Sequence, residues 1–182
     1  MSDASLVDDL PGELLMWVLI VSELLVFGAG LVAFMAVRLT DPVGFAEAQT
    51  HLHQTGAALN TVVLVTSGFL AAKALVWRRA GRRGAAKSAL GVAAALGVVF
   101  LVVKGVEYAD KAGQGITPES HPFFMFYYLL TGFHAAHVLA GVFLLLLVAL
   151  RDHPRNIEAG AQFWHMVDLV WVLLFPVVYL LG

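Results

Sequence analysis

The chain has 182 residues, of which 60% are hydrophobic and 13% are charged, and its mean hydropathy is +0.83. This composition excludes an ordinary soluble domain and predicts a membrane protein. The absence of cysteine excludes disulfides, thiolate metal sites and iron–sulfur clusters, and the net charge of −2 gives no reason to expect a nucleic-acid partner.

The segment before the first apolar run is acidic. It carries Asp3, Asp8, Asp9 and Glu13 and has no Lys or Arg. A secretory signal needs a positively charged region ahead of its apolar stretch. We therefore expect the first apolar run to stay in the mature protein.

Five stretches are long and apolar enough to cross a hydrocarbon core of ~30 Å, which takes about 20 residues of helix. Short polar connections separate them, and no change in composition divides the chain. The sequence predicts an all-α bundle of five transmembrane helices in a single domain, residues 1–182. The expected helices cover residues 14–37, 57–77, 90–108, 123–150 and 162–181.

Basic residues gather on one side of this predicted topology. Residues 78–87 hold five of them and residues 151–161 hold two, whereas the opposite side has Arg38 and Lys111, and gains Lys104 if that side chain extends outward. The positive-inside rule then places the N-terminus in the cytoplasm and the C-terminus outside. We expect a multi-pass protein of a bacterial-type inner membrane.

Several ionisable residues fall inside the predicted spans, where they are costly and usually face the bundle interior. A rise of ~1.5 Å per residue gives their approximate depths. These depths predict that Glu107 meets His134 toward the outer side and that Glu23 meets His137 or Asp168 nearer the middle. The candidate site residues are Glu23, Glu107, His134, His137, His165 and Asp168.

Three interpretations of this set stay open. The first is a network of buried polar pairs that fixes helix register, and the second is a site for lipid head groups or for protons. The third is a metal or haem site, although the His-x-x-His and His-x-x-Asp spacings differ from the Glu-x-x-His motifs of di-metal bundles. His51, His53, His121 and His153 are interpreted as solvated loop residues. Asn60 and Thr61 are interpreted as a polar pair at a helix end.

The same residues carry a resemblance to a known family. The motif at 131–138, Thr-Gly-Phe-His-Ala-Ala-His-Val, and the motif at 164–171, Trp-His-Met-Val-Asp-Leu-Val-Trp, are similar to two helices of cytochrome c oxidase subunit III. The segments 17–27 around Ser22-Glu23, 59–68 and 104–108 resemble three further helices of that family, in the right order. Long members have seven helices, so the chain resembles a short form, such as the nitric-oxide-reductase-associated branch.

The resemblance implies a non-catalytic membrane subunit of a haem–copper respiratory complex, with no active site of its own. The family's subunit binds neither haem nor copper, which belong to a catalytic subunit I-like partner. It holds phospholipids and supports the stability and proton uptake of that partner. By the same resemblance, Glu23 corresponds to the family's carbodiimide-reactive carboxylate, with His134, His137, His165 and Asp168 forming the polar network behind it.

Two alternatives come from other classes. One is a stand-alone membrane protein that binds a metal or haem through the same His and carboxylate residues, and the other is an assembly factor. The sequence has no inverted repeat and no matching pair of broken helices, which argues against a small transporter.

Overall fold

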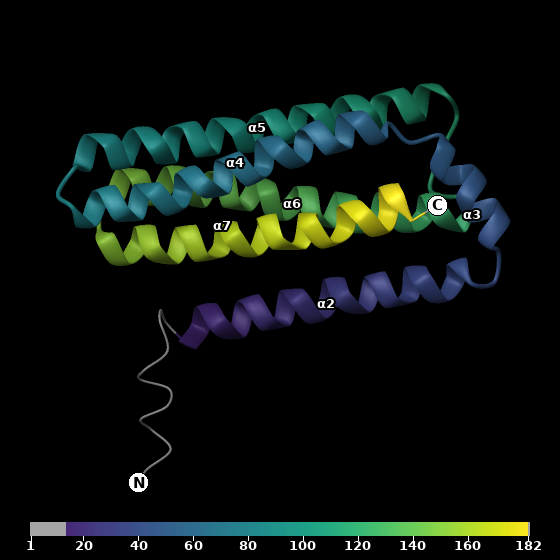
Figure 1. Cartoon of the computed structure of the whole chain (residues 1–182), viewed down its shortest axis with the longest axis horizontal. Helices are drawn as coiled ribbons and strands as arrows, with labels where there is room; N and C mark the ends of the chain where they lie inside the picture. The colour runs from purple at the N-terminus through teal and green to yellow at the C-terminus, as the bar shows by residue number, and fades with distance from the viewer. Residues whose placement is uncertain (1–13, 182) are drawn as a thin grey trace, which may run out of the picture.

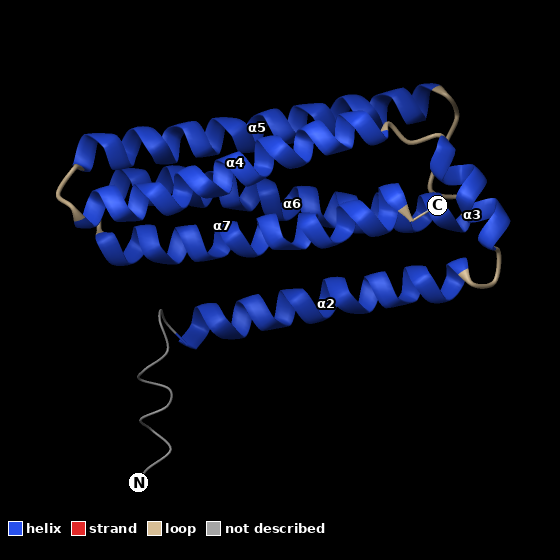
Figure 2. Ribbon diagram, in the orientation of Figure 1, coloured by secondary structure: helices blue, strands red, loops and turns tan. Residues whose placement is uncertain are grey.

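The computed structural model describes residues 14–181, and five long helices lie side by side in it (Figure 1). All regular structure in that range is helical, as Figure 2 shows. Each of the five spans is long and apolar enough to cross a bilayer. This confirms the predicted all-α, multi-pass architecture. The spans are α2 (Leu14–Arg38), α4 (Gln54–Arg79), α5 (Arg83–Gly113), α6 (Pro122–Arg151) and α7 (Pro154–Phe175), which continues into the π-helical turn η1 (Pro176–Leu180). The acidic residues Asp3, Asp8, Asp9 and Glu13 lie outside the described range.

Two short elements at one end of the bundle were not predicted. The helix α3 (Pro42–Thr50) begins with proline at its first position, and the Asp41 carboxylate accepts a hydrogen bond from the Gly44 N–H at 3.1 Å. At η1, Pro176 offers no N–H to continue the α-helical pattern, and the turn widens. The buried Gln49 amide donates to the Val178 carbonyl at 3.0 Å and so ties α3 to η1.

Two predicted helix starts were wrong by about two turns. The third span begins at Arg83 instead of Leu90, and the fifth begins at Pro154 instead of Gln162. In the fifth, the His153 ring accepts a hydrogen bond from the Arg155 N–H at 3.3 Å, which caps the helix. Hydropathy marks where a helix becomes apolar, whereas caps and helix-forming polar residues set where it begins.

The four helices α4 to α7 pack around the indole of Trp164. The fully buried ring lies between Gly97 of α5 and Gly141 of α6, where a Cβ would come within 2.5–2.7 Å of ring carbons. Its N–H donates to the Ser67 hydroxyl of α4 at 3.0 Å, and that hydroxyl donates to the Ala93 carbonyl at 2.7 Å. One residue of α7 thus joins all four helices.

The helix α2 lies beside this four-helix bundle (Figure 1). In its most apolar stretch only 11% of the residues are buried, against 33–50% in the other spans. Its two buried side chains are Phe27 and Phe34. Phe34 meets the edges of Phe45, Phe123 and Phe126 at centroid distances of 5.4–5.9 Å. The attachment of α2 is therefore mainly aromatic and is densest near α3.

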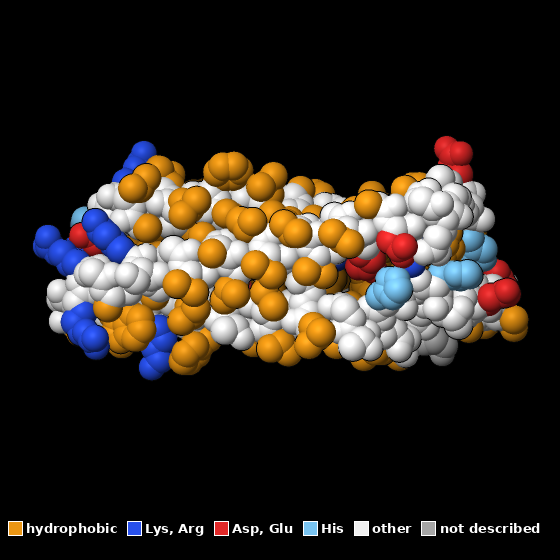
Figure 3. All heavy atoms as spheres, turned by 90° about the horizontal axis from the view of Figure 1, so that it is seen from above, with side chains coloured by type: hydrophobic (Ala, Val, Ile, Leu, Met, Phe, Trp, Pro, Cys, Tyr) orange, Lys and Arg blue, Asp and Glu red, His pale blue; other side chains and the backbone are white. Residues whose placement is uncertain are grey.

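The two ends of the molecule differ in charge (Figure 3). At one end Arg78 donates to the Asp152 carboxylate at 2.7 Å and to its carbonyl at 2.9 Å, where Asp152 holds a left-handed backbone with φ of 48°. At the opposite end His53 lies 3.2 Å from Asp110, and His121 lies 3.2 Å from Asp41. The prediction that the loop histidines are simply solvated was incomplete, because His53, His121 and His153 each hold a loop or a cap in place.

Candidate functional site

The most enclosed polar cluster surrounds Lys104. Its ammonium lies 2.9 Å from the Glu107 carboxylate, 2.7 Å from the Tyr179 hydroxyl and 3.2 Å from the Tyr127 hydroxyl. Tyr179 in turn donates to Glu107 at 3.1 Å. Only 2% of Lys104 and 8% of Glu107 are exposed. Lys104 therefore does not extend outward, because a carboxylate three residues along the same helix face is the nearer partner.

Aromatic rings complete the surroundings of this ammonium. The centroids of Tyr108, Tyr127, Tyr179 and Trp171 lie 4.7–5.8 Å from Nζ. A desolvated cation over a ring gains about 2 kcal/mol. The cage thus offsets part of the cost of placing the ion pair in a low-dielectric interior.

Glu23 and His137 form a second pair, between α2 and α6. The His137 Nε2 lies 3.2 Å from a Glu23 carboxylate oxygen, and both side chains are mostly covered. The His137 Nδ1 lies 2.9 Å from the Phe133 carbonyl of the preceding turn, so both ring nitrogens have a neighbour. This is one of the two contacts predicted for Glu23. It is the main polar link between α2 and the bundle in the middle of the span.

His134 lies fully buried, and neither of its ring nitrogens has a hydrogen-bond partner among the described residues. The ring stacks on Trp171 with centroids 5.1 Å apart and meets the edges of Phe100 and Phe27. The predicted contact between Glu107 and His134 was wrong, because Lys104 and Tyr179 occupy the Glu107 carboxylate. His134 serves as an aromatic packing residue at the centre of the bundle.

His165 and Asp168 lie on one face of α7, as their spacing predicts. The His165 Nδ1 is 3.7 Å from an Asp168 carboxylate oxygen. The pair is seated on Gly68 of α4, where a Cβ would overlap the carboxylate. Glycine at this position lets the Asp168 side chain approach the α4 backbone.

Asn60 and Thr61 do not lie at a helix end, so that interpretation was wrong. The helix α4 begins at Gln54, more than a turn earlier. Asn60 donates to the Phe100 carbonyl of α5 at 3.2 Å, and Thr61 accepts from the Trp171 indole at 2.8 Å. Both residues connect helices inside the bundle.

The six candidate residues do not converge on one centre. Glu23 pairs with His137 and His165 with Asp168, whereas Glu107 pairs with Lys104 and His134 packs among aromatic rings. Within residues 14–181, no group of three or more His, Asp or Glu side chains is arranged to hold a metal ion. The donor set fits a metal poorly, since His137 faces Glu23, His165 faces Asp168, and the His134 nitrogens are surrounded by apolar rings. Of these contacts, the pair of Glu23 with His137 joins two helices, and the pair of His165 with Asp168 lies within α7.

Sequence reasoning missed Lys104, Tyr127 and Tyr179 as members of the polar core. A signal was present, because Lys104 lies three residues before Glu107 in an otherwise apolar run. No such sequence signal marked Tyr127 and Tyr179, because their contact with α5 depends on how the helices pack.

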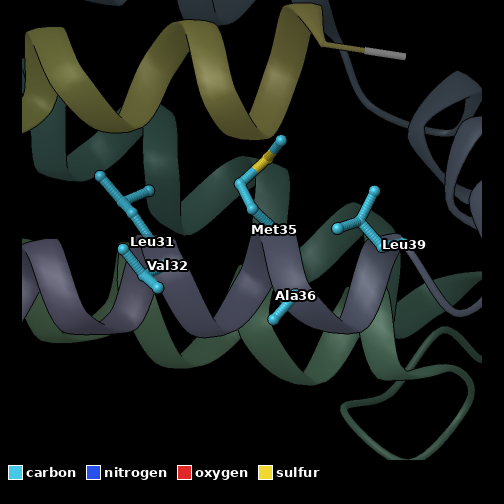
Figure 4. Close-up of a pocket in the computed structure, with 5 residues that line it drawn as sticks. All are labelled: Leu31, Val32, Met35, Ala36 and Leu39. Carbon is cyan, nitrogen blue, oxygen red and sulfur yellow. The ribbon is translucent and has the colours of Figure 1, made fainter.

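Two apolar grooves lie along α2. One is formed by Leu31, Val32, Met35, Ala36 and Leu39, and Figure 4 shows Leu31, Met35 and Leu39 pointing to the same side of the helix. The other lies between α2 and α6 and is lined by Val26, Phe27, Gly30, Leu129, Leu130 and Phe133. Both are lined by apolar side chains at membrane depth.

Comparison with known proteins gives a consistent result. The family model of cytochrome c oxidase subunit III matches residues 12–182. The chain is 30% identical over 171 residues to cytochrome c oxidase subunit 3 of Synechocystis, covering 89% of this chain and 72% of the relative. It is also 30% identical over 173 residues to the subunit 3 of Corynebacterium diphtheriae, covering 89% and 84%. Subunit 3 of the cytochrome bo(3) ubiquinol oxidase of Pseudomonas aeruginosa is 26% identical over 174 residues, covering 91% and 83%. The chain therefore belongs to the cytochrome c oxidase subunit III family.

Proposed function

We propose that this protein is the non-catalytic third subunit of a haem–copper oxidase and packs in the membrane against the catalytic subunit that carries the haem and copper. The observation that carries this proposal is the family match over residues 12–182. Two sets of contacts between helices support a structural role. Glu23 of α2 meets His137 of α6, and Lys104 of α5 donates to Tyr127 of α6 and to Tyr179 of η1.

We propose that the grooves beside α2 hold the acyl chains of phospholipids. Their linings consist of aliphatic and aromatic side chains, and the groove between α2 and α6 includes Gly30, which leaves room beside the helix backbone. Phe27 and Phe133 line that groove, and both contact His137, the partner of Glu23. In this proposal Glu23 therefore lies close to the bound lipid. A partly covered carboxylate there suits a supporting role in proton uptake.

We propose that the end with Arg78 and Asp152 faces the cytoplasm, which places the N-terminus there and the C-terminus outside. Excess Lys and Arg at one end support this orientation. Because the chain has no cysteine, Gly81→Cys and Gly115→Cys, in the loops of opposite ends, can report it. An impermeant maleimide added to intact cells should label Gly115→Cys alone.

The test of the proposed function is a mild-detergent purification of the tagged chain, with a visible spectrum and protein identification on the same sample. Haem that arrives with a large catalytic subunit supports the proposal. Haem or metal bound to this chain alone supports the stand-alone alternative, and a colourless chain without partners favours the assembly factor.

The association with nitric oxide reduction stays a prediction. The same purified complex distinguishes the two cases by its consumption of oxygen or of nitric oxide. Oxygen consumption without nitric oxide consumption would contradict the branch assignment and leave the subunit III function intact.

A further inference from the structure

An exposed titratable side chain lies near the middle of α7. His165 is 47% exposed and lies eleven residues after the first residue of α7, in a span of 27 residues. At ~1.5 Å per residue it is ~16 Å from the start of the helix. A bilayer offers no hydrogen-bond partner at that depth, so an exposed imidazole there is costly.

The carboxylate beside His165 is also incompletely satisfied. One Asp168 oxygen faces the His165 Nδ1, and the other is buried without a hydrogen-bond partner in the described range. Gly68 of α4 lies directly under both side chains. The pair is therefore held in a fixed place on the surface between α4 and α7.

Most of the surface around this pair is apolar, and at its edge the Lys73 ammonium lies 5.5 Å from the Phe69 ring centroid. Val65 and Phe69 of α4 are 49% and 59% exposed, and Leu169 and Val172 of α7 are 46% and 44% exposed. A polar pair surrounded by exposed aliphatic and aromatic side chains has the composition of a helix–helix contact in a membrane, where one hydrogen bond adds to close packing. We call these four residues with His165 and Asp168 the α4–α7 face.

The exposed mid-span surfaces of α5 and α6 differ. The exposed mid-span residues of α5 and α6 include Val98, Val99, Leu139 and Phe143, which need no polar partner. The exposed Ser22 hydroxyl donates to a carbonyl of its own helix. Lipid alone can cover these surfaces.

We propose that the α4–α7 face is the docking surface for a transmembrane helix of the catalytic subunit, which supplies a hydrogen-bond donor to His165. With Asp168 ionised, the His165 Nδ1 carries the proton that faces it, and Nε2 is an acceptor. A hydroxyl, indole or guanidinium group of the partner fits this acceptor. This inference rests on the proposed function and adds the place of contact.

Site-directed cross-linking in native membranes tests the contact, because the chain has no cysteine of its own. Leu169→Cys and Val172→Cys carry a maleimide photo-cross-linker, and Val99→Cys and Phe143→Cys are matched controls on α5 and α6. We expect cross-linking to the catalytic subunit at least several-fold stronger from the α7 positions. Cross-links to that subunit from the control positions alone overturn the proposal, as do α7 cross-links only to lipid or to a second copy of this chain.

A second measurement targets the hydrogen bond. His165→Leu removes the acceptor, whereas His165→Gln keeps a carbonyl oxygen that can accept. We expect several-fold less haem to co-purify with His165→Leu and little loss with His165→Gln. Equal haem recovery for both variants overturns the hydrogen-bond role.

The two proposals fail differently. If the unmodified tagged chain brings no haem-containing subunit, the proposed function fails. If it brings that subunit while the α4–α7 face gives no cross-link, only the docking surface fails. The melting temperature of each purified variant verifies that the chain is folded.

Discussion

The helix α2 and the four-helix bundle of α4 to α7 are built differently. The bundle is held by Trp164 between two glycines and by a caged ion pair, whereas α2 is attached through aromatic edges and the pair of Glu23 with His137. Only 11% of the apolar stretch of α2 is buried, against at least 33% in each bundle span. Glu23, the carboxylate with the proposed role in proton uptake, therefore lies on α2, the helix that is held by the fewest buried contacts.

The largest effect should come from breaking the caged ion pair. Lys104→Leu leaves Glu107 without its cation in the interior, which should cost about 3–5 kcal/mol of folding free energy. The double variant Lys104→Leu/Glu107→Leu should recover much of this loss. Thermal unfolding in detergent measures both, with Lys73→Leu, a change at an exposed lysine, as the control. If Lys104→Leu is no less stable than this control, the caged ion pair does not stabilise the bundle.

Overpacking the centre of the bundle should have the next largest effect. Gly141→Ala places a Cβ 2.5 Å from the Trp164 ring, and the shift needed to relieve that contact should cost about 1–3 kcal/mol. Gly105→Ala on α5 is the control, since nothing lies within 4 Å of its added carbon. Equal melting temperatures for the two variants would show that the packing around Trp164 can accommodate an added methyl group without loss of stability.

A smaller effect is expected at the attachment of α2. Glu23→Gln weakens the contact with His137 and should cost about 1 kcal/mol, because both side chains are partly exposed. Glu23 and Glu107 should also differ in their reactivity. A hydrophobic carbodiimide in membranes should modify Glu23 and leave Glu107 unmodified. Peptide mass spectrometry identifies the modified residue. Equal modification of Glu107 would mean that the bundle is as open as α2.

The smallest effect should appear at the end of α2, in the loop that precedes α3. The Gly44 N–H and, after it, His121 hold the pKa of Asp41 below its ordinary value of 3.8. A lowered folded-state pKa means that this stabilisation is present above about pH 4 and is lost as the pH falls through the folded-state pKa.

Asp41→Asn keeps an oxygen for the cap and removes the charge, so its melting temperature should change less with pH in this acidic window. Glu47→Gln, a change at an exposed α3 residue, should follow the unmodified chain. Identical pH profiles for Asp41→Asn and the unmodified chain would exclude Asp41 as a pH-dependent anchor.

The fold was largely predictable, because five apolar stretches of sufficient length leave few alternatives for a membrane protein. The contact of Glu23 with His137 was also predictable, since both lie near the middle of their spans and each has few other polar choices. The pair of His165 with Asp168 followed from helical spacing alone.

The remaining contacts depended on rotations that hydropathy does not fix. Rotation of a helix about its axis changes the neighbours of a residue without changing its depth. Depth alone therefore could not show that Glu107 faces Lys104 and Tyr179, or that His134 faces Trp171. The short helix α3 and the π-helical turn were missed because neither is long enough to span a bilayer, the criterion that found the other helices.

The tie between Arg78 and Asp152 has a consequence for biogenesis. Only residues 152 and 153 connect α6 to α7, so we expect these helices to enter the membrane as one hairpin. Arg78, in the last turn of α4, is synthesised well before Asp152, so its positive charge should still be unpaired when α4 is inserted. The contact at 2.7 Å should then form only when the last hairpin arrives. We expect the same arginine to help set topology first and to close the bundle later.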